Sequence, residues 1–228
     1  MKVLEINNVH KIYNSSEVQV HAVNGITVDF EEGEFAAIVG PSGSGKTTLL
    51  NMIGGLDQPT EGEILVDHTN LANLKSSRLI DFRMRNIGFV FQSYNLIPVL
   101  TAKENVEFIM NLQKWKKEDR DTRTYELLKA VGLEDRAGSR PARLSGGQQQ
   151  RVAVARALAS KPKFVLADEP TANLDSKSTE TLLDIMEELN REERITFIFS
   201  THDARVVKKA RRGVTIEDGK IISDEQKK

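Results

Sequence analysis

The sequence contains no cysteine, which excludes disulfide bonds and thiolate metal sites. It also has almost no excess charge of either sign, because 32 lysine and arginine residues nearly cancel 33 aspartate and glutamate residues and leave a net charge of −1. Proteins that bind nucleic acid hold it largely through a positive field that attracts phosphate. The balance leaves room for a local basic patch, but we expect no nucleic-acid partner.

Long hydrophobic runs are missing as well. The apolar run Phe35–Val39 is far shorter than the roughly 20 residues that a membrane-spanning helix needs. The first residues, Met1–Glu5, lack the apolar core of a signal peptide. We therefore expect a soluble, cytoplasmic chain without direct membrane insertion. Its 228 residues, 39% of them apolar, give room for one compact α/β unit, or for a core with a small attached subdomain.

The order of the predicted elements indicates an α/β fold. Short β-rich segments open the chain, helical patterns dominate from about residue 101 to 160, and strands then alternate with a helix. Such alternation is typical of a parallel sheet with crossover helices. We therefore predict a parallel-sheet core, an antiparallel β-flank at the front and a helical insertion at about residues 95–160. The predicted strands are Lys2–Asn7, Ile26–Phe30, Glu34–Val39, Gly62–Val66, Ile87–Phe91, Phe164–Ala167 and Ile195–Ser200, and the predicted helices are Lys46–Ile53, Glu104–Lys117, Tyr125–Val131, Ser145–Ser160 and Lys177–Asn190.

A glycine-rich segment joins the predicted strand at 34–39 to the predicted helix at 46–53. Glycines let successive backbone N–H groups turn towards phosphate oxygens, and the start of a helix favours negative charge. Lys46 supplies a cation for the β- and γ-phosphates, and Thr47 offers a hydroxyl to Mg²⁺. This pattern predicts a nucleotide-phosphate site, without separating kinases, GTPases and ATPases. The segment reads Gly40-Pro41-Ser42-Gly43-Ser44-Gly45-Lys46-Thr47 and fits G-x-x-x-x-G-K-S/T without a gap.

A second acidic site is predicted where the apolar strand Phe164–Ala167 runs into Asp168 and Glu169. Open α/β sheets place ligands at the carboxyl ends of their strands. Asp168 would then hold Mg²⁺ together with Thr47, directly or through a water. Glu169 would orient and deprotonate a water at the γ-phosphate. The alternative is that the two acids only cap a helix that has Pro170 in its first turn.

The segment Leu144-Ser145-Gly146-Gly147-Gln148 narrows the family. It offers a hydroxyl and glycine N–H groups at the start of a helix, a second setting suited to phosphate. In isolation it would fit a capped helix with a flexible entry equally well. It resembles, without a mismatch, the signature motif of the ATP-binding-cassette (ABC) ATPases. Together with the order of the segments 40–47, 144–148 and 164–169, it makes the chain similar to that family over about residues 2–222.

The resemblance implies roles for further residues. Tyr13 stands where ABC ATPases carry an aromatic ring that stacks on adenine, although Tyr13 alone would fit a half-buried strand aromatic. Gln92 resembles the glutamine that touches Mg²⁺ and the attacking water. His202 resembles the switch histidine that contacts the γ-phosphate, although a lone histidine there would be a satisfied polar group. The segment Asn173-Leu174-Asp175 resembles the loop that crosses the dimer seam.

The resemblance also implies the fold, the ligands and a self-association. The family fold is a P-loop NTPase with a RecA-like parallel-sheet core, an N-terminal antiparallel β-subdomain and an inserted α-helical subdomain, here a single domain over residues 1–228. Two chains meet head to tail and sandwich two ATP molecules with Mg²⁺. Each ATP would contact residues 40–48 of one subunit, Thr48 included, and Ser145–Gln148 of a second copy.

An integral-membrane permease is the further partner that the resemblance implies, which would place the chain peripherally on the cytoplasmic face of the cell membrane. Within the family it looks closest to the lipoprotein-release and macrolide-export group, which implies export or extraction of a lipoprotein, peptide or drug. The segments that carry this likeness are Gly54–Asp57, Gly88–Gln92, Asn95–Pro98 and Thr101–Val106.

Competing functions remain at this point. A cell-division regulator of the same subfamily would use the same dimer switch and move no solute, and nothing in the sequence separates it from an exporter. Soluble ABC proteins of DNA repair carry a long coiled coil before the signature, and those of translation carry two cassettes, so both fit less well. A metabolic kinase would lack the signature.

Two features stand outside the family pattern. Where these proteins often have an Asp-Arg pair before the final strands, this chain reads Ala210-Arg211-Arg212-Gly213. The missing acid puts one local contact in doubt and leaves the nucleotide site unaffected. His10, His21 and His68 match no family position, and we predict no role for them.

Overall fold

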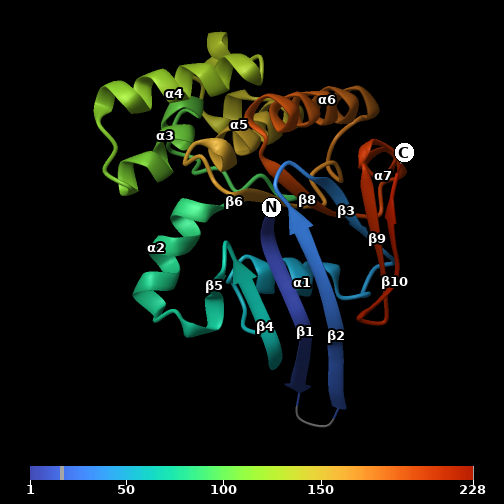
Figure 1. The fold of residues 1–228 in the computed structure, drawn as a ribbon. Coiled ribbons are helices and arrows are strands. Elements are labelled where there is room, and N and C mark those ends of the chain that lie inside the picture. Colours follow the sequence, from blue (N-terminus) through green and yellow to red (C-terminus); the bar gives the residue numbers. More distant parts are fainter. Residues whose placement is uncertain (16–17, 228) are drawn as a thin grey trace.

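The computed structural model describes residues 1–15 and 18–227, which form two β-sheets with helices between and beside them (Figure 1). Within these residues, an antiparallel sheet has four strands in the order β2-β1-β4-β5, and a second sheet has six strands in the order β10-β9-β3-β8-β7-β6. In the second sheet only the edge pair β9 and β10 is antiparallel among the described pairings. The strands are β1 (Lys2–Ser15), β2 (Val18–Glu31), β3 (Phe35–Val39), β4 (Glu61–Val66), β5 (Thr69–Asn70), β6 (Ile87–Val90), β7 (Phe164–Asp168), β8 (Thr196–Thr201), β9 (Arg212–Glu217) and β10 (Lys220–Gln226).

The helices are a central one, a group on the far face of the second sheet that α7 joins through Val206, and α2, none of whose residues is fully buried. Helix α1 lies against both sheets, while α3 to α6 gather at the opposite end of the molecule (Figure 1). Among the described residues, no helix combines the length and the apolar character that a membrane span requires. The helices are α1 (Lys46–Ile53), α2 (Ser76–Asn86), α3 (Ala102–Leu112), α4 (Lys117–Ala130), α5 (Gly146–Leu158), α6 (Ser176–Glu193) and α7 (Ala204–Lys209).

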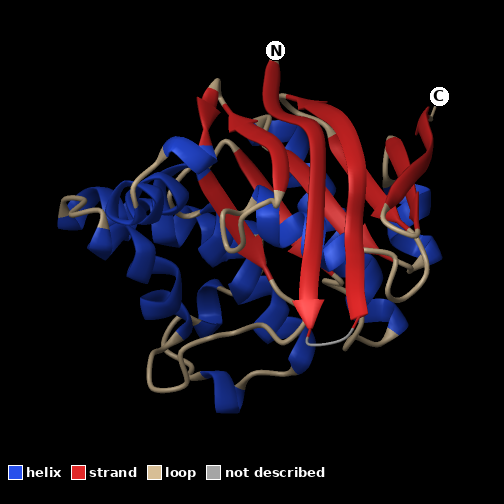
Figure 2. Cartoon of the chain, turned by 90° about the horizontal axis from the view of Figure 1, so that it is seen from below, coloured by secondary structure: helices blue, strands red, loops and turns tan. Residues whose placement is uncertain are grey.

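The strands β3, β7 and β8 of the second sheet are buried on both faces, and their alternate residues pack into two separate cores. In β3, Ala36 and Ile38 pack towards α1 and the antiparallel sheet, whereas Phe35 and Ala37 pack towards the group of α3 to α6. Such strands read as continuous apolar runs because neither face meets water. Figure 2 shows the resulting layers, with the antiparallel sheet in front of the helices. The predicted α/β class, parallel core sheet and antiparallel front sheet are confirmed.

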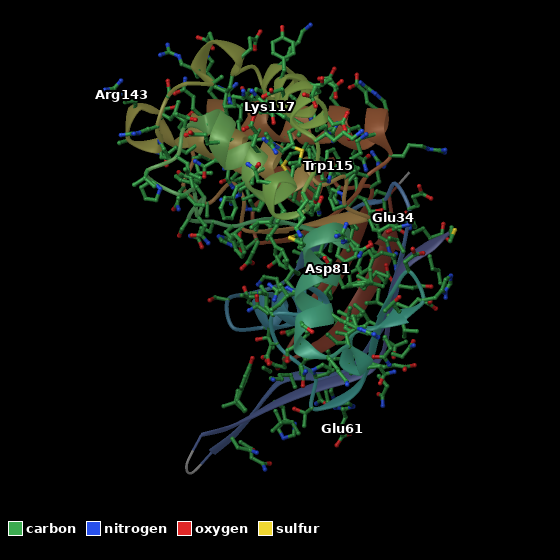
Figure 3. All side chains as sticks on the ribbon, turned by 90° about the vertical axis from the view of Figure 1, so that its left-hand side faces the viewer. Glu34, Glu61, Asp81, Trp115, Lys117 and Arg143 are labelled. Atoms are coloured by element: carbon green, nitrogen blue, oxygen red, sulfur yellow. The ribbon has the colours of Figure 1, made fainter. Side chains whose placement is uncertain are left out.

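Some predicted element bounds were wrong. The helix predicted at Glu104–Lys117 begins at Ala102 and ends at Leu112, because Lys114 takes a left-handed φ of 59° that no helix continues through. The next helix then begins at Lys117 rather than at Tyr125. The indole N–H of Trp115 donates to Gln113 in this break, and the Gln113 amide donates to the carbonyl of Met84 on α2. Figure 3 shows this side of the molecule, with Trp115 and Asp81 of α2 labelled.

Arg212, in the segment that lacks the family's usual aspartate, forms ion pairs with acidic side chains from other segments. The Arg212 guanidinium donates to both carboxylate oxygens of Asp224 on β10 over 2.7 Å, and to Glu34 over 3.0 and 3.2 Å. The hydrogen bonds that Arg212 donates to Asp224, followed by the charge of Glu34, hold the pKa of Arg212 above its ordinary value. The last strand is therefore tied to the core through this ion cluster.

Candidate functional site

The glycine-rich segment joins the end of β3 to the start of α1. Its backbone is left-handed at Gly43, with φ 81°, and at Gly45, with φ 99°. A Cβ at Gly45 would lie 2.1 Å from the carbonyl oxygen of Ala22, and a Cβ at Gly40 would lie 2.1 Å from that of Ile216. Larger residues are excluded at both places, so the loop keeps the side-chain-free shape that a phosphate cradle requires.

Lys46 and Thr47 connect this loop to the second acidic site. Lys46 is 7% exposed, and its ammonium donates to the carbonyl oxygens of Gly40 over 2.8 Å and Pro41 over 2.7 Å. These bonds fix a positive charge beside the loop. The Thr47 hydroxyl donates to Oδ1 of Asp168 over 3.2 Å. The two segments that the sequence placed in one site are therefore neighbours.

Asp168 lies at the carboxyl end of β7, where burial raises the pKa of its carboxyl above the ordinary value. Burial disfavours the charged form, and a cation bound nearby would offset that cost. Among the described residues, no three His, Cys, Asp or Glu side chains gather into a metal cage. Mg²⁺ needs no such cage, because proteins hold it with one or two oxygens and leave the rest to phosphates and water. The hydroxyl of Thr47, the carboxylate of Asp168 and the amide oxygen of Gln92 fit that preference.

Glu169 is held at both carboxylate oxygens. Its backbone is left-handed, with φ 45°, and its N–H donates to the carbonyl of Ser200 over 2.9 Å. Oε2 accepts from the hydroxyl of Thr201 over 3.2 Å, and Oε1 lies 2.7 Å from Nδ1 of His202. The side chain of Glu169 is 17% exposed and that of His202 is 72% exposed. The carboxylate thus has a fixed position beside a side chain that reaches into solvent.

One cavity of about 510 Å³ is lined by part of the glycine-rich loop and by Lys46, Thr47, Glu169 and His202. Gln92 also lines this cavity, and its backbone carbonyl accepts from the side-chain amide of Asn173 over 3.0 Å. Gly40, Pro41 and Ser44 lie outside the lining, and so does Asp168, whose carboxylate accepts from the lining residue Thr47. The predicted site residues that line the cavity are Ser42, Gly43, Gly45, Lys46, Thr47, Thr48, Gln92, Glu169 and His202.

Further lining residues had no signal in the sequence. His21, for which we predicted no role, lines the cavity together with its neighbours Val20 and Ala22 on β2. Asp218 and Gly219 come from the turn between β9 and β10. Strand β9 pairs in parallel with β3, which precedes the phosphate loop, and the N–H of Gly219 donates to the carbonyl of Ser44 in that loop over 3.1 Å. Only a pattern that linked the phosphate loop to the last hairpin would have found them.

Tyr13 lies on β1 and is not part of the cavity lining. Tyr13 is 41% exposed, its hydroxyl donates to Asp57 over 2.8 Å, and the ammonium of Lys11 lies 5.0 Å from the centroid of its ring. The hydrogen bond to Asp57 therefore fixes the side chain, and part of it remains exposed to solvent. Its role as an adenine platform stays a prediction.

The signature residues lie in a different cavity. Ser145 caps α5, and the Gln148 side chain accepts from the Ser145 N–H, which makes a capping box. Ser145, Gly147 and Gln148 line a cavity of about 190 Å³ that shares no lining residue with the phosphate-loop cavity. Two cationic side chains, Arg151 and Lys177, also line this cavity. The structure therefore does not bring the two predicted phosphate settings of one chain together.

Comparison with known proteins gives one consistent result. The sequence model of the ABC transporter family matches residues 23–172. YvrO of Bacillus subtilis, an uncharacterised ABC transporter ATP-binding protein, is 49% identical over 98% of this chain and 97% of its own. MJ0796 of Methanocaldococcus jannaschii, of the same description, is 44% identical over 98% of this chain and 97% of its own.

Solved structures agree with the sequence relatives. The dimeric structure of the ATP-binding cassette MJ0796 in a post-hydrolysis state, bound to ADP and Pi, superposes with a TM-score of 0.90 at 43% identity and covers 99% of both chains. CbiO1 from Clostridium perfringens, part of the transporter complex cbiONQ, superposes with a TM-score of 0.89 at 30% identity, over 99% of this chain and 88% of its own.

Proposed function

The chain belongs to the ABC transporter family as an ATP-binding subunit that hydrolyses ATP, and on that premise we propose that two copies close on ATP to drive a separate integral-membrane permease. The observation that carries the proposal is the separation of the two cavities. The phosphate loop and the signature residues of one chain line different cavities. One ATP can contact both kinds of site only when a second copy supplies the signature, and the dimeric relatives support such self-association.

ATP would bind with its phosphates in the loop of residues 40–45. The backbone N–H groups of the loop and the dipole of α1 favour the negative charge, and Lys46 contacts the β- and γ-phosphates. Thr48, on the first turn of α1, lines the same cavity. Tyr13 would stack on the adenine through its exposed ring face, a contact typical of aromatic platforms for bases.

Thr47, Asp168 and Gln92 would hold Mg²⁺. The ion, when bound, neutralises charge on the β- and γ-phosphate oxygens. The Thr47 hydroxyl already donates to Asp168 over 3.2 Å, so the two side chains need little rearrangement to share a ligand. Gln92 would approach from the end of β6 and contact both the ion and the attacking water.

Glu169 would act as the general base. A carboxylate held by Thr201 and His202 can orient a water in line with the γ-phosphate and take its proton as the bond to the leaving ADP breaks. His202 would contact the γ-phosphate from the same side. Ser145, Gly146, Gly147 and Gln148 of the second copy would bind that phosphate from across the interface. Loss of the γ-phosphate then removes the bridging charge and opens the dimer.

The permease is proposed to be of the lipoprotein-release and macrolide-export type, with the chain on the cytoplasmic face of the membrane. In this arrangement, ATP-driven closure exports or extracts a lipoprotein, peptide or drug. The support for this type of permease is the likeness of the segments Gly54–Asp57 and Asn95–Pro98 to that group. Fold and ATPase activity alone do not specify a cargo.

The test is to purify a tagged Glu169→Gln variant, locked with ATP and Mg²⁺, from detergent-solubilised native membranes and to identify its partners by mass spectrometry. Lys46→Ala, which should not retain the nucleotide, is the matched control. We expect a stoichiometric polytopic protein with a large extracytoplasmic domain, present with Glu169→Gln and reduced with the control. Recovery with soluble proteins alone, and absence from the membrane fraction, would contradict the permease assignment.

A further inference from the structure

Gln150 of α5 is a fully buried amide in a helix that is otherwise packed by apolar side chains at this level, with Val152, Ala153 and Val154 following it. Its Nε2 donates to the carbonyl oxygen of Pro170 over 2.7 Å and to that of Phe91 over 3.3 Å. Both partners are acceptors, so the NH₂ group must face them and the orientation of the amide is determined.

The two carbonyl groups belong to the loops that carry predicted catalytic residues. Phe91 directly precedes Gln92, and Pro170 directly follows Glu169. The strands before them, β6 and β7, pair in parallel up to Val90 and Ala167, but beyond that point no strand pairing holds the two loops together. Beyond that point the Gln150 amide donates to both backbones, and together with the bond from the Asn173 amide to the Gln92 carbonyl it fixes their separation.

Helix α5 is also fastened to the rest of the Gln92 loop. The Arg156 guanidinium donates to the carbonyl oxygens of Tyr94, over 2.8 Å, and Asn95, two residues whose φ values are 60° and 50°. The same helix also lies close to β6, because a Cβ at Gly88 of β6 would lie 2.5 Å from the carbonyl oxygen of Ala157 on α5. The loop and β6 therefore have to follow any displacement of α5.

Packing alone does not explain an amide at this position. Among the described residues, Oε1 of Gln150 is buried without a hydrogen-bond partner. A buried acceptor without a partner is unfavourable, and an apolar side chain of the same size would fill the space without that cost. The amide is explained by its two donated bonds.

We propose that Gln150 is a positioning residue that sets the distance between Gln92 and Glu169 and transmits movement of α5 to both. The inference rests on the proposed function, in which the first turn of α5, Ser145–Gln148, binds the γ-phosphate held by the partner copy. Binding of the partner's γ-phosphate to the signature of one chain would thereby move Gln92 and Glu169 in the phosphate-loop cavity of that same chain.

The experiment compares Gln150→Met with the wild type and with Gln149→Met in the full-length purified protein. Methionine keeps the volume and removes both donors, and Gln149, whose amide donates to Leu144, controls for a glutamine lost from the same helix. We expect ATP turnover of Gln150→Met to fall at least about tenfold, since misplaced catalytic groups cost up to about a hundredfold. The equilibrium constant for ATP binding should change less than twofold, and Gln149→Met should behave as the wild type in both respects.

Turnover of Gln150→Met within twofold of the wild type would overturn the inference and leave the proposed function intact. So would a loss of turnover matched by an equal loss of ATP binding, because that reports a structural defect. Wild-type protein without ATP turnover would overturn the proposed function and the inference together.

A second variant covers the case in which Gln150→Met does not fold. Gln150→Glu puts a carboxyl against the same two carbonyl groups, and burial raises the pKa of such a carboxyl. Its protonated form can donate to Pro170, so its turnover relative to the wild type should rise as the pH falls from about 8 to about 6. A ratio that does not change with pH would count against a positioning role.

Discussion

Asp203 shows how single side chains shape the catalytic edge of the sheet. It follows His202, and its carboxylate accepts from the Arg205 guanidinium over 2.8 Å, from the Arg205 N–H over 2.9 Å and from the Thr171 hydroxyl over 2.9 Å. These bonds, that from the Arg205 side chain first, lower the pKa of Asp203 from 3.8 to about 2. Because Thr171 lies two residues after Glu169, the cluster links the loops that carry Glu169 and His202.

The lowered pKa predicts a pH-dependent stability. The folded carboxyl binds protons less readily than the unfolded one, so its contribution is complete above the unfolded pKa and is lost as the pH falls towards the folded value. We expect Asp203→Asn to unfold at lower urea concentration than the wild type at neutral pH. The gap between the two midpoints should narrow as the pH falls below about 4. A gap of constant size down to about pH 2.5 would contradict this account.

At this scale the sequence predicts the residues whose chemistry depends on local backbone. Lys46, Thr47, Asp168 and Glu169 lie where their strand–loop positions required, because a glycine loop and a strand end are local features. His21 and Asp218 could not be predicted as cavity residues. They reach the cavity through contacts between segments far apart in the sequence, and neither residue type nor local spacing encodes such contacts.

Among the elements, α5 carries the most connections between site segments. It starts at the signature, holds the Gln92 and Glu169 loops through Gln150, and lies directly on β6. The contact with β6 depends on Gly88, since a Cβ there would approach the backbone oxygen of Ala157 to 2.5 Å and its carbonyl carbon to 3.2 Å. Backbone cannot rotate away as a flexible side chain can.

Gly88→Ala should therefore push α5 away from β6. We expect a loss of about 1–3 kcal/mol in the free energy of unfolding, as for other overpacked cores, measured by urea denaturation. Gly138→Ala is the matched control, because a Cβ at Gly138 would meet nothing within 4 Å. Equal effects of the two substitutions would show that close approach at Gly88 is not what sets the packing.

The bounds of helices and strands were predictable where the sequence has both a terminating or capping residue and a periodic set of apolar residues. Helix α1 has the predicted bounds, and Thr101 and Glu104 form a capping box at the start of α3. Helix α2 was missed because none of its residues is fully buried and only Leu79 and Phe82 pack against the core, which makes its apolar face narrow. Strand β1 runs past the predicted end at Asn7 because Asn8 adopts a left-handed φ of 47° and a register shift absorbs it.

For the whole molecule, the layered fold keeps the phosphate loop and the signature of one chain apart, as the proposed composite site requires. The sheet of β3, β7 and β8 presents the phosphate loop, Asp168 and Glu169 at one set of strand ends. The signature stands at the start of α5, in the helical group on the other face of the core. A second copy related head to tail would bring that signature to the first copy's phosphate loop.

The most direct test of this account is sedimentation velocity of the Glu169→Gln variant with and without ATP and Mg²⁺. Replacing the base should slow hydrolysis by about 10²–10⁴-fold and leave the γ-phosphate in place. We predict a monomer without nucleotide, a dimer with ATP and a monomer with ADP. Lys46→Ala should stay monomeric throughout because it does not retain ATP. A Glu169→Gln protein that binds ATP and remains a monomer would contradict the composite site, and so would a dimer whose amount does not depend on nucleotide.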